Sequence, residues 1–252
     1  MNKKEFEEKV LEIKNVLNEQ DSTLLKSELV VERNFKLSPS STNREIFEWY
    51  SNICSENSLK VEQVDLRDCE EWTTTNQNIK HKSNKFFEII GLKIQNSHSR
   101  EVGQKGWFQP IIKEVGYDGG TLGLLRKKVS GIPHYLINAK AEPGNYNGIQ
   151  LSPTLQATKS NLEAAHGGLK PLFLDYFLDT KSDNEIIFDQ WLPEDGGRLF
   201  LKRNRGIVLG ISENTKIELP KDFKWVTLNQ IIKFIQEENI VNPHLRSLIS
   251  IL

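Results

Sequence analysis

The residues best suited to chemistry lie in the stretch 139–161, which reads AKAEPGNYNGIQLSPTLQATKSN. A Pro-Gly-Asn-Tyr-Asn-Gly turn over 143–148 predicts two strands that reverse on each other. Lys140 and Glu142 are two residues apart on the first strand, so their side chains share one face. Burial raises the pKa of a carboxylate and a neighbouring ammonium offsets it, so this pair is suited to proton transfer near neutral pH. A structural ion pair explains the same two residues equally well.

The second predicted strand alternates between apolar and hydrogen-bonding side chains. If the two strands pair, one polar wall carries Asn138, Lys140, Glu142, Gln150, Ser152, Thr154, Gln156 and Thr158. Neutral amides and hydroxyls dominate this wall, whereas the charged residues make up 27% of the whole chain. Such a surface suits a polyhydroxylated ligand, which needs many donors and acceptors. An antiparallel sheet with one face in water is the alternative interpretation.

Two further clusters could bind parts of a nucleotide. Lys202-Arg203-Asn204-Arg205 places three cations within four residues, which suits a phosphate or diphosphate, although the pattern by itself favours a solvated turn. Arg100, Trp107 and Gln109 lie close together in REVGQKGWFQP. An aromatic ring with a guanidinium suits a base or a sugar ring, although a tryptophan at a strand start also suits a core.

Composition narrows the classes of function. The 252 residues hold 33 Lys and Arg against 34 Asp and Glu, a net charge of −1, which argues against a generally basic nucleic-acid binder. The sequence contains neither a GxxxxGK[ST] nor a GxGxxG motif, so no nucleotide cofactor is expected. The histidines show no metal-ligand spacing, so no metal is expected either. Cys54 and Cys69 form no CxxC pair. Without a signal peptide or an apolar run of about 18 residues, the expected location is the cytoplasm, away from any membrane.

The elements that must position these residues follow the order helices, strands, helices, which predicts an α+β fold. Helices are expected over 1–20 and 43–56, with a polar loop over 21–43, so 1–58 is predicted to be an N-terminal helical segment. The remainder, 59–252, is predicted to be one module. Its expected strands are 59–66, 84–94, 106–112, 120–129, 132–142, 149–158, 185–192, 198–204 and 206–211, and its expected helices are 170–179, 227–239 and 243–252.

The string AKAEPGNYNGIQLSPTLQATKSNLEAAHGG at 139–168 closely resembles the NDP-hexose 2,3-dehydratase family. Other strings fit the same pattern in the same order: REV at 100–102, GWFQPII at 106–112, GTLGLL at 120–125, FLKRNR at 200–205 and VNPHLRSLIS at 241–250. The resemblance covers about residues 46–250. It implies a Nudix-like mixed sheet flanked by helices. The chain lacks the metal-binding box GX5EX7REUXEEXGU, which argues against a metal-dependent diphosphate hydrolase.

The resemblance implies a lyase that removes the C2 hydroxyl and the C3 proton of an NDP-4-keto-6-deoxyhexose, with thymidine diphosphate (dTDP) as the usual nucleotide. The product would be a 3,4-diketo-2,6-dideoxy sugar for deoxysugar biosynthesis. On this hypothesis Glu142 is the main acid/base and Lys140 polarises the C4 oxygen or assists proton transfer. The expected substrate-binding residues are Arg100, Trp107, Gln109, Asn145, Gln150, Ser152, Thr154, Gln156, Asn161, Arg203 and Arg205.

Members of this family resemble two such modules in tandem, whereas this chain resembles one. Homodimerisation is therefore expected to reproduce the pair. The reactive diketone implies a partner ketoreductase that acts next. The alternative function is a non-catalytic nucleotide-sugar-binding module that acts with another chain.

Overall fold

The computed structural model describes residues 1–17, 23–95, 106–116, 119–162, 169–178 and 184–252. Over these residues it has helices α1 (Lys3–Val16), α2 (Leu24–Asn34), α3 (Asn43–Ser55), α4 (Lys159–Leu162), α5 (Leu174–Leu178), α6 (Leu228–Ile235) and α7 (Pro243–Ile249), and a 3-10 turn at Leu66–Asp68. The strands are β1 (Trp72–Thr74), β2 (Asn78–His81), β3 (Phe87–Ile94), β4 (Trp107–Glu114), β5 (Gly120–Val129), β6 (Ile132–Ala141), β7 (Ile149–Ser152), β8 (Leu155–Ala157), β9 (Glu185–Pro193), β10 (Arg203–Gly210) and β11 (Phe223–Val226).

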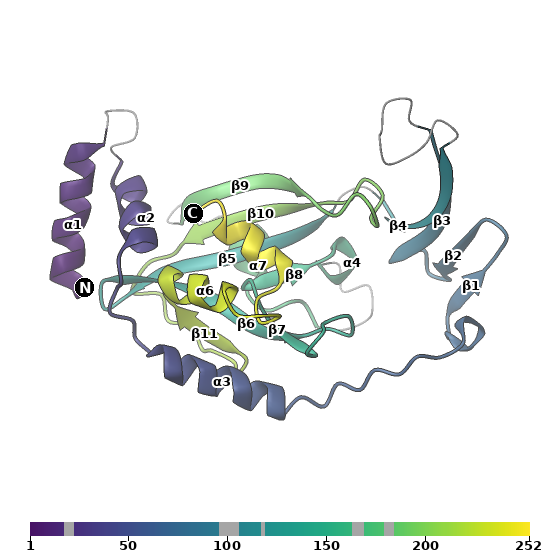
Figure 1. Ribbon diagram of the computed structural model, residues 1–252, viewed down its shortest axis with the longest axis horizontal. Helices are drawn as coiled ribbons and strands as arrows, with labels where there is room; N and C mark the ends of the chain where they lie inside the picture. Colours follow the sequence, from purple (N-terminus) through teal and green to yellow (C-terminus); the bar gives the residue numbers. More distant parts are fainter. Residues whose placement is uncertain (18–22, 96–105, 117–118, 163–168, 179–183) are drawn as a thin grey trace.

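A seven-stranded sheet forms the centre of the described structure, in the order β11-β6-β5-β10-β9, with β7 paired to β6 and β8 paired to β5 (Figure 1). The β5–β10 pair is parallel, and the other pairs of this sheet are antiparallel. One face packs against α3, α6 and α7, and the other against α5. The predicted α+β class is therefore confirmed, with a mixed sheet between helices.

The predicted loop over 21–43 is wrong, because α2 occupies Leu24–Asn34 with Thr23 as its N-cap. The sequence pattern does not predict this helix because its buried face includes two glutamates, Glu28 and Glu32. Hydrophobic periodicity does not detect such a face. Both carboxylates bind Arg126 of β5, at 2.5 and 2.6 Å, so the buried charges are paired.

The predicted strand 149–158 is in fact two strands, because the chain crosses from β6 to β5 at Pro153. Ser152 of β7 is opposite Asn138, whereas Leu155 of β8 is opposite Gly123. Thr154 lies between them, buried, where β5 and β6 separate. Its hydroxyl accepts from the Leu125 N–H at 3.0 Å and donates to the carbonyl of residue 136. One side chain thus satisfies two backbone groups that the separation would leave unpaired.

A four-stranded antiparallel sheet, β1-β2-β3-β4, lies beside the central sheet over the described residues (Figure 1). Ile112 joins the two parts: its N–H donates to the Arg198 carbonyl, and its carbonyl accepts from the Phe200 N–H. The predicted strand at 59–66 is absent, and the predicted strand at 198–204 is a turn that leads into β10 at Arg203. The helix expected over 170–179 is shortened to α5. The expected boundary at residue 58 stays a prediction.

Candidate active site

A polar pocket of about 170 Å³ opens beside β8, where β6 has left β5. Its walls come from β5, β6, β8, α4, α7 and the turn before β10. Its polar side chains are Lys140, Glu142, Gln156, Thr158, Asn161, Glu194, Lys202, Asn204 and His244. We refer to this set as the polar pocket. The separation of β5 and β6 creates the pocket, because side chains line the space there instead of paired backbone.

One side of the polar pocket is a chain of hydrogen bonds around Glu142. Lys140 Nζ lies 3.2 Å from Glu142 Oε1 and also donates to the Gln156 carbonyl at 3.1 Å. The Gln156 amide donates to both oxygens of Glu142, at 3.0 and 3.2 Å. The Gln156 amide oxygen in turn accepts from Asn242, the N-cap of α7, at 2.8 Å. The network fixes the Lys140–Glu142 pair, while both side chains remain about one-third exposed.

The opposite side of the polar pocket holds a histidine and a second carboxylate. His244 lies in the first turn of α7, with its Nε2 at 3.3 Å from Glu194 Oε1. Burial lowers the pKa of His244 below its ordinary value, although the carboxylates of Glu194 and Glu142 raise it and the ammonium of Lys140 adds to the lowering. The imidazole is therefore neutral near pH 7 and able to accept a proton.

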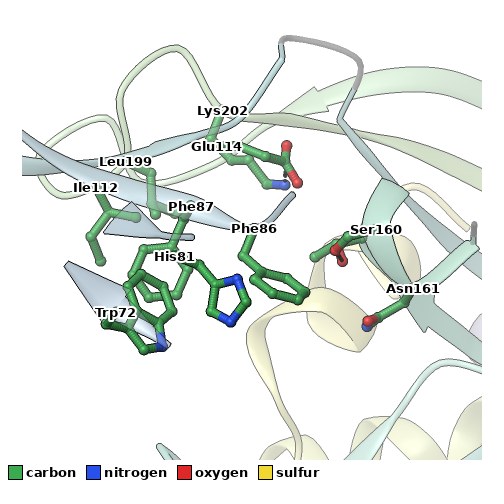
Figure 2. A pocket seen from close by; sticks show the side chains of 11 residues that line it. Trp72, His81, Phe86, Phe87, Ile112, Glu114, Ser160, Asn161, Leu199 and Lys202 are labelled. Atoms are coloured by element: carbon green, nitrogen blue, oxygen red, sulfur yellow. Dashed lines mark hydrogen bonds and ion pairs between the residues drawn. The ribbon is translucent and has the colours of Figure 1, made fainter. Parts of the chain in front are cut away.

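A larger cavity of about 520 Å³ adjoins the polar pocket and is lined by aromatic side chains (Figure 2). Trp72, His81, Phe86 and Phe87 gather on one side, and the Trp72 and Phe87 rings are 4.8 Å apart between centroids. Ser160 and Asn161 of α4 lie on the other side, as Figure 2 shows. This aromatic cavity suits a planar ring.

Three residues line both hollows: Thr158, Asn161 and Lys202. Lys202 Nζ pairs with Glu114 Oε2 at 2.6 Å, and both side chains are mostly buried, at 11% and 17% exposed (Figure 2). The junction therefore holds an ion pair, whose ammonium lies between a cavity lined by aromatic rings and a pocket lined by hydrogen-bonding side chains. A ligand that joins a planar ring to a sugar through phosphates has this sequence of groups.

The structure places several predicted binding residues away from the polar pocket. Ser152 donates to the Asn138 carbonyl, and Thr154 bridges the separating strands, so the structure corrects the expected continuous wall: their hydroxyls serve the backbone. Gln150 donates to the Asn239 carbonyl, and Asn145 donates to the carbonyls of Lys140 and Gly148 within the turn. Gln156 and Asn161 do line the pocket, with Lys140 and Glu142.

The predicted diphosphate ligands Arg203 and Arg205 lie on the face of β10 opposite to the polar pocket. Side chains alternate along a strand, and Asn204, between them, lines the pocket. Arg205 instead pairs with Asp189 of β9. Arg203 stacks over Trp191, with its guanidinium carbon 4.4 Å from the ring centroid.

Trp107 and Gln109 bind each other at the start of β4. The indole Nε1–H donates to the Gln109 amide oxygen at 2.7 Å, and the Gln109 amide donates to the Gly197 carbonyl. Neither side chain lines the aromatic cavity. Arg100 lies outside the described residues, so its predicted role stays a prediction.

Sequence reasoning missed His244, Glu194 and Asn242 as members of the site. The signal for two of them was present, since Asn242 and His244 belong to the string VNPHLRSLIS that carries the family resemblance. Glu194 follows a predicted strand with no motif around it. Lys202 was noted as part of the cationic cluster, but without its own role.

Within the described residues, no group of three or more His, Cys, Asp or Glu side chains is placed to hold a metal ion. No described helix is both long and apolar enough to cross a membrane.

Together, the mixed sheet and the two adjoining hollows define a small-molecule-binding α+β module. The profile of the NDP-hexose 2,3-dehydratase family matches residues 43–252, and the chain belongs to that family. It is 35% identical over 204 residues to the dTDP-4-dehydro-6-deoxy-alpha-D-glucopyranose 2,3-dehydratase of Saccharopolyspora spinosa, covering 80% of this chain and 40% of the relative. The Amycolatopsis orientalis enzyme of the same name is 35% identical over 209 residues, covering 81% of this chain and 43% of the relative.

The chain thus spans less than half the length of these relatives. Among solved structures, a Nudix hydrolase from M. smegmatis matches with a TM-score of 0.35 and 14% identity, over 60% of this chain and 95% of that one. This likeness is too slight to carry an argument. The Nudix-like interpretation therefore rests on the family resemblance.

Proposed function

We propose that the chain is a nucleotide-sugar 2,3-dehydratase that acts on an NDP-4-keto-6-deoxyhexose, with dTDP-4-keto-6-deoxy-D-glucose as the substrate. Membership of the family and the names of the relatives support the reaction and the nucleotide. The observation that carries the proposal is the Lys140–Glu142 pair, fixed in a polar pocket that opens into an aromatic cavity.

The proposed substrate spans both hollows. The thymine base stacks among the aromatic rings around Trp72 and Phe86, and the hexose enters the polar pocket. Lys202, at the junction, faces the diphosphate as a point charge. Asn161 and Gln156 provide amide groups for the sugar hydroxyls.

The reaction needs acid–base chemistry and oxyanion stabilisation. The C4 ketone acidifies the C3 hydrogen, so loss of that proton gives an enolate at the C4 oxygen. The Lys140 ammonium polarises the C4 oxygen and stabilises the enolate. Glu142 is the acid/base that exchanges protons with the substrate oxygens, together with its partner Lys140. The C2 hydroxyl leaves as water, and the enol becomes the 3,4-diketo-2,6-dideoxy sugar.

A coupled assay tests this function. The purified chain is incubated with dTDP-4-keto-6-deoxyglucose, a 3-ketoreductase and NADPH, and a reduced 2-deoxy product is expected by mass spectrometry. Glu142→Gln is expected to abolish turnover but to retain dTDP binding by calorimetry, because the aromatic cavity is unchanged. Glu218→Gln, at an exposed position that lines neither hollow, is the matched control. Nucleotide-sugar binding by the wild type without product would support the non-catalytic alternative.

We also propose that the chain self-associates, so that two copies provide a pair of modules, and that a 3-ketoreductase consumes the diketone. The tandem modules that the family resemblance implies support the first proposal, and the reactivity of a vicinal diketone supports the second. Light scattering at micromolar concentration is expected to give twice the chain mass. A monomer under those conditions would contradict self-association.

A further inference from the structure

The elimination transfers protons at carbon as well as at oxygen, so the contacts of each group that could accept a proton in the polar pocket matter. Both oxygens of Glu142 accept hydrogen bonds from Gln156, and one also lies 3.2 Å from the Lys140 ammonium. Both carboxylate oxygens of Glu142 are therefore already engaged by donors from the protein. Its place beside an ammonium suits proton exchange with oxygen atoms.

The opposite wall of the same pocket holds another group that can accept a proton. His244 Nε2 lies 3.3 Å from Glu194, whose side chain is 16% exposed. A carboxylate in this position fixes the tautomer with hydrogen on Nε2 and stabilises the imidazolium once it forms. No hydrogen bond to His244 Nδ1 is found among the described residues, so this nitrogen keeps a free lone pair.

The secondary structure holds the histidine in place. Asn242 caps α7 by accepting from the Leu245 N–H at 2.9 Å, and its amide also donates to Gln156. The capping residue therefore ties the helix turn that carries His244 to the network that holds Glu142. The wall with Glu142 and the wall with His244 therefore hold each other in place.

We propose that His244, positioned by Glu194, is the base that removes the C3 proton of the sugar. This inference rests on the proposed function and assigns a residue to its first step. Glu194 is a positioning residue, because it acts through the imidazole.

The atoms and electrons of the elimination balance with these groups. The C3–H bond breaks, its proton goes to Nδ1 of His244, and its electron pair forms the enolate at the C4 oxygen. The enolate then collapses to form the C2=C3 double bond while the C2–O bond breaks, and the Lys140–Glu142 pair gives the departing oxygen a proton to form water. His244 returns a proton to C2, the C3 hydroxyl gives its proton to the Lys140–Glu142 pair, and the diketone results. No oxidant or reductant is consumed.

A substrate analogue without the leaving group isolates the first step. In D₂O, the 2-deoxy analogue of dTDP-4-keto-6-deoxyglucose cannot eliminate water, so NMR reports enzyme-catalysed exchange at C3. The C5 hydrogen, also next to the ketone, is the internal reference for uncatalysed exchange. His244→Asn keeps an amide that can face Glu194 but cannot accept the proton, and is expected to slow C3 exchange about a hundredfold or more.

Glu142→Gln is expected to leave C3 exchange at least about tenfold faster than His244→Asn leaves it. Both variants are expected to abolish turnover of the parent sugar. Calorimetry with dTDP should give a dissociation constant within about threefold of wild type for each variant, since the aromatic cavity is untouched. Exchange by His244→Asn at the wild-type rate, while the wild type turns over the parent sugar, overturns this inference alone. A wild type that neither exchanges C3 nor eliminates water overturns the proposed function and the inference with it.

The pH profile tests the role of Glu194. The charged groups that face His244 are Glu194, Glu142, Lys140 and Lys202, with Asp195 on the rim of the adjoining hollow and Arg246 on its own helix. Exchange requires the neutral imidazole, so its rate rises with pH through the pKa of His244. Glu194→Gln removes a carboxylate that raises this pKa and is expected to move the midpoint to lower pH. A uniform loss of rate with an unmoved midpoint would assign Glu194 a structural role and overturn its positioning role.

Discussion

Replacement of Thr154 by valine tests whether one hydroxyl holds open the strand separation that forms the polar pocket. The side chain is 2% exposed, and valine has nearly the same shape, so packing changes little. The substitution removes two hydrogen bonds and leaves the Leu125 N–H and the Leu136 carbonyl buried without that partner. Each such group costs about 1–3 kcal/mol. We therefore expect the free energy of unfolding to fall by about 3 kcal/mol.

Urea denaturation followed by tryptophan fluorescence measures this change, and a fall of about 3 kcal/mol corresponds to a melting temperature about 6–12 °C lower in a domain of this size. Thr154→Ser is the matched control, since it keeps the hydroxyl and loses one methyl group, worth about 1 kcal/mol. Equal stabilities of the Val and Ser variants would refute the reasoning, because the hydroxyl would then contribute nothing to the separated strands.

Four further outcomes follow from the contacts. Trp72→Ala is expected to weaken dTDP binding by about 1–3 kcal/mol in calorimetry, since it removes a stacking surface, whereas normal affinity would place the base elsewhere. Arg205→Met is expected to leave that affinity unchanged, because the guanidinium lies on the other face of β10 with Asp189; a large loss would contradict this placement. Arg126→Met leaves the buried carboxylate of Glu32 without its cation, while Glu28 keeps Lys128, and is expected to cost about 3–5 kcal/mol in urea denaturation. Burial lowers the pKa of His134, so as the pH falls the unfolded chain takes up a proton on this side chain before the folded protein does. The free energy of unfolding is therefore expected to rise between about pH 5 and pH 7, and His134→Asn is expected to flatten that slope.

The order of elements and one wall of the site could be predicted from the sequence. Local alternation places Lys140 and Glu142 together, and the turn at 143–148 brings β7 against β6 as expected. These relations depend on neighbours in the chain, which periodicity and turn chemistry describe well.

The rest depends on contacts between distant segments. His244 and Glu194 are 50 residues apart, and no pattern along the chain indicates that α7 packs beside the end of β9. The diphosphate role of Arg203 and Arg205 rests on the number of cations in the cluster, whereas β10 begins within that cluster. Inside a strand the cations point away from the pocket, and only the intervening Asn204 points toward it.

The buried cluster between α2 and the central sheet has a consequence for evolution and for truncation. Glu28 and Glu32 lie before residue 43, where the family match begins, yet they neutralise Arg126 within it, and Glu32 also accepts from the Tyr135 hydroxyl at 2.7 Å. A relative without these carboxylates must compensate at the arginine position, so the three positions should covary. A fragment starting at residue 43 would expose β5 and leave Arg126 without the carboxylates of Glu28 and Glu32. The N-terminal helices thus cover a surface that the family-matched part of the chain cannot expose unless its own interior changes.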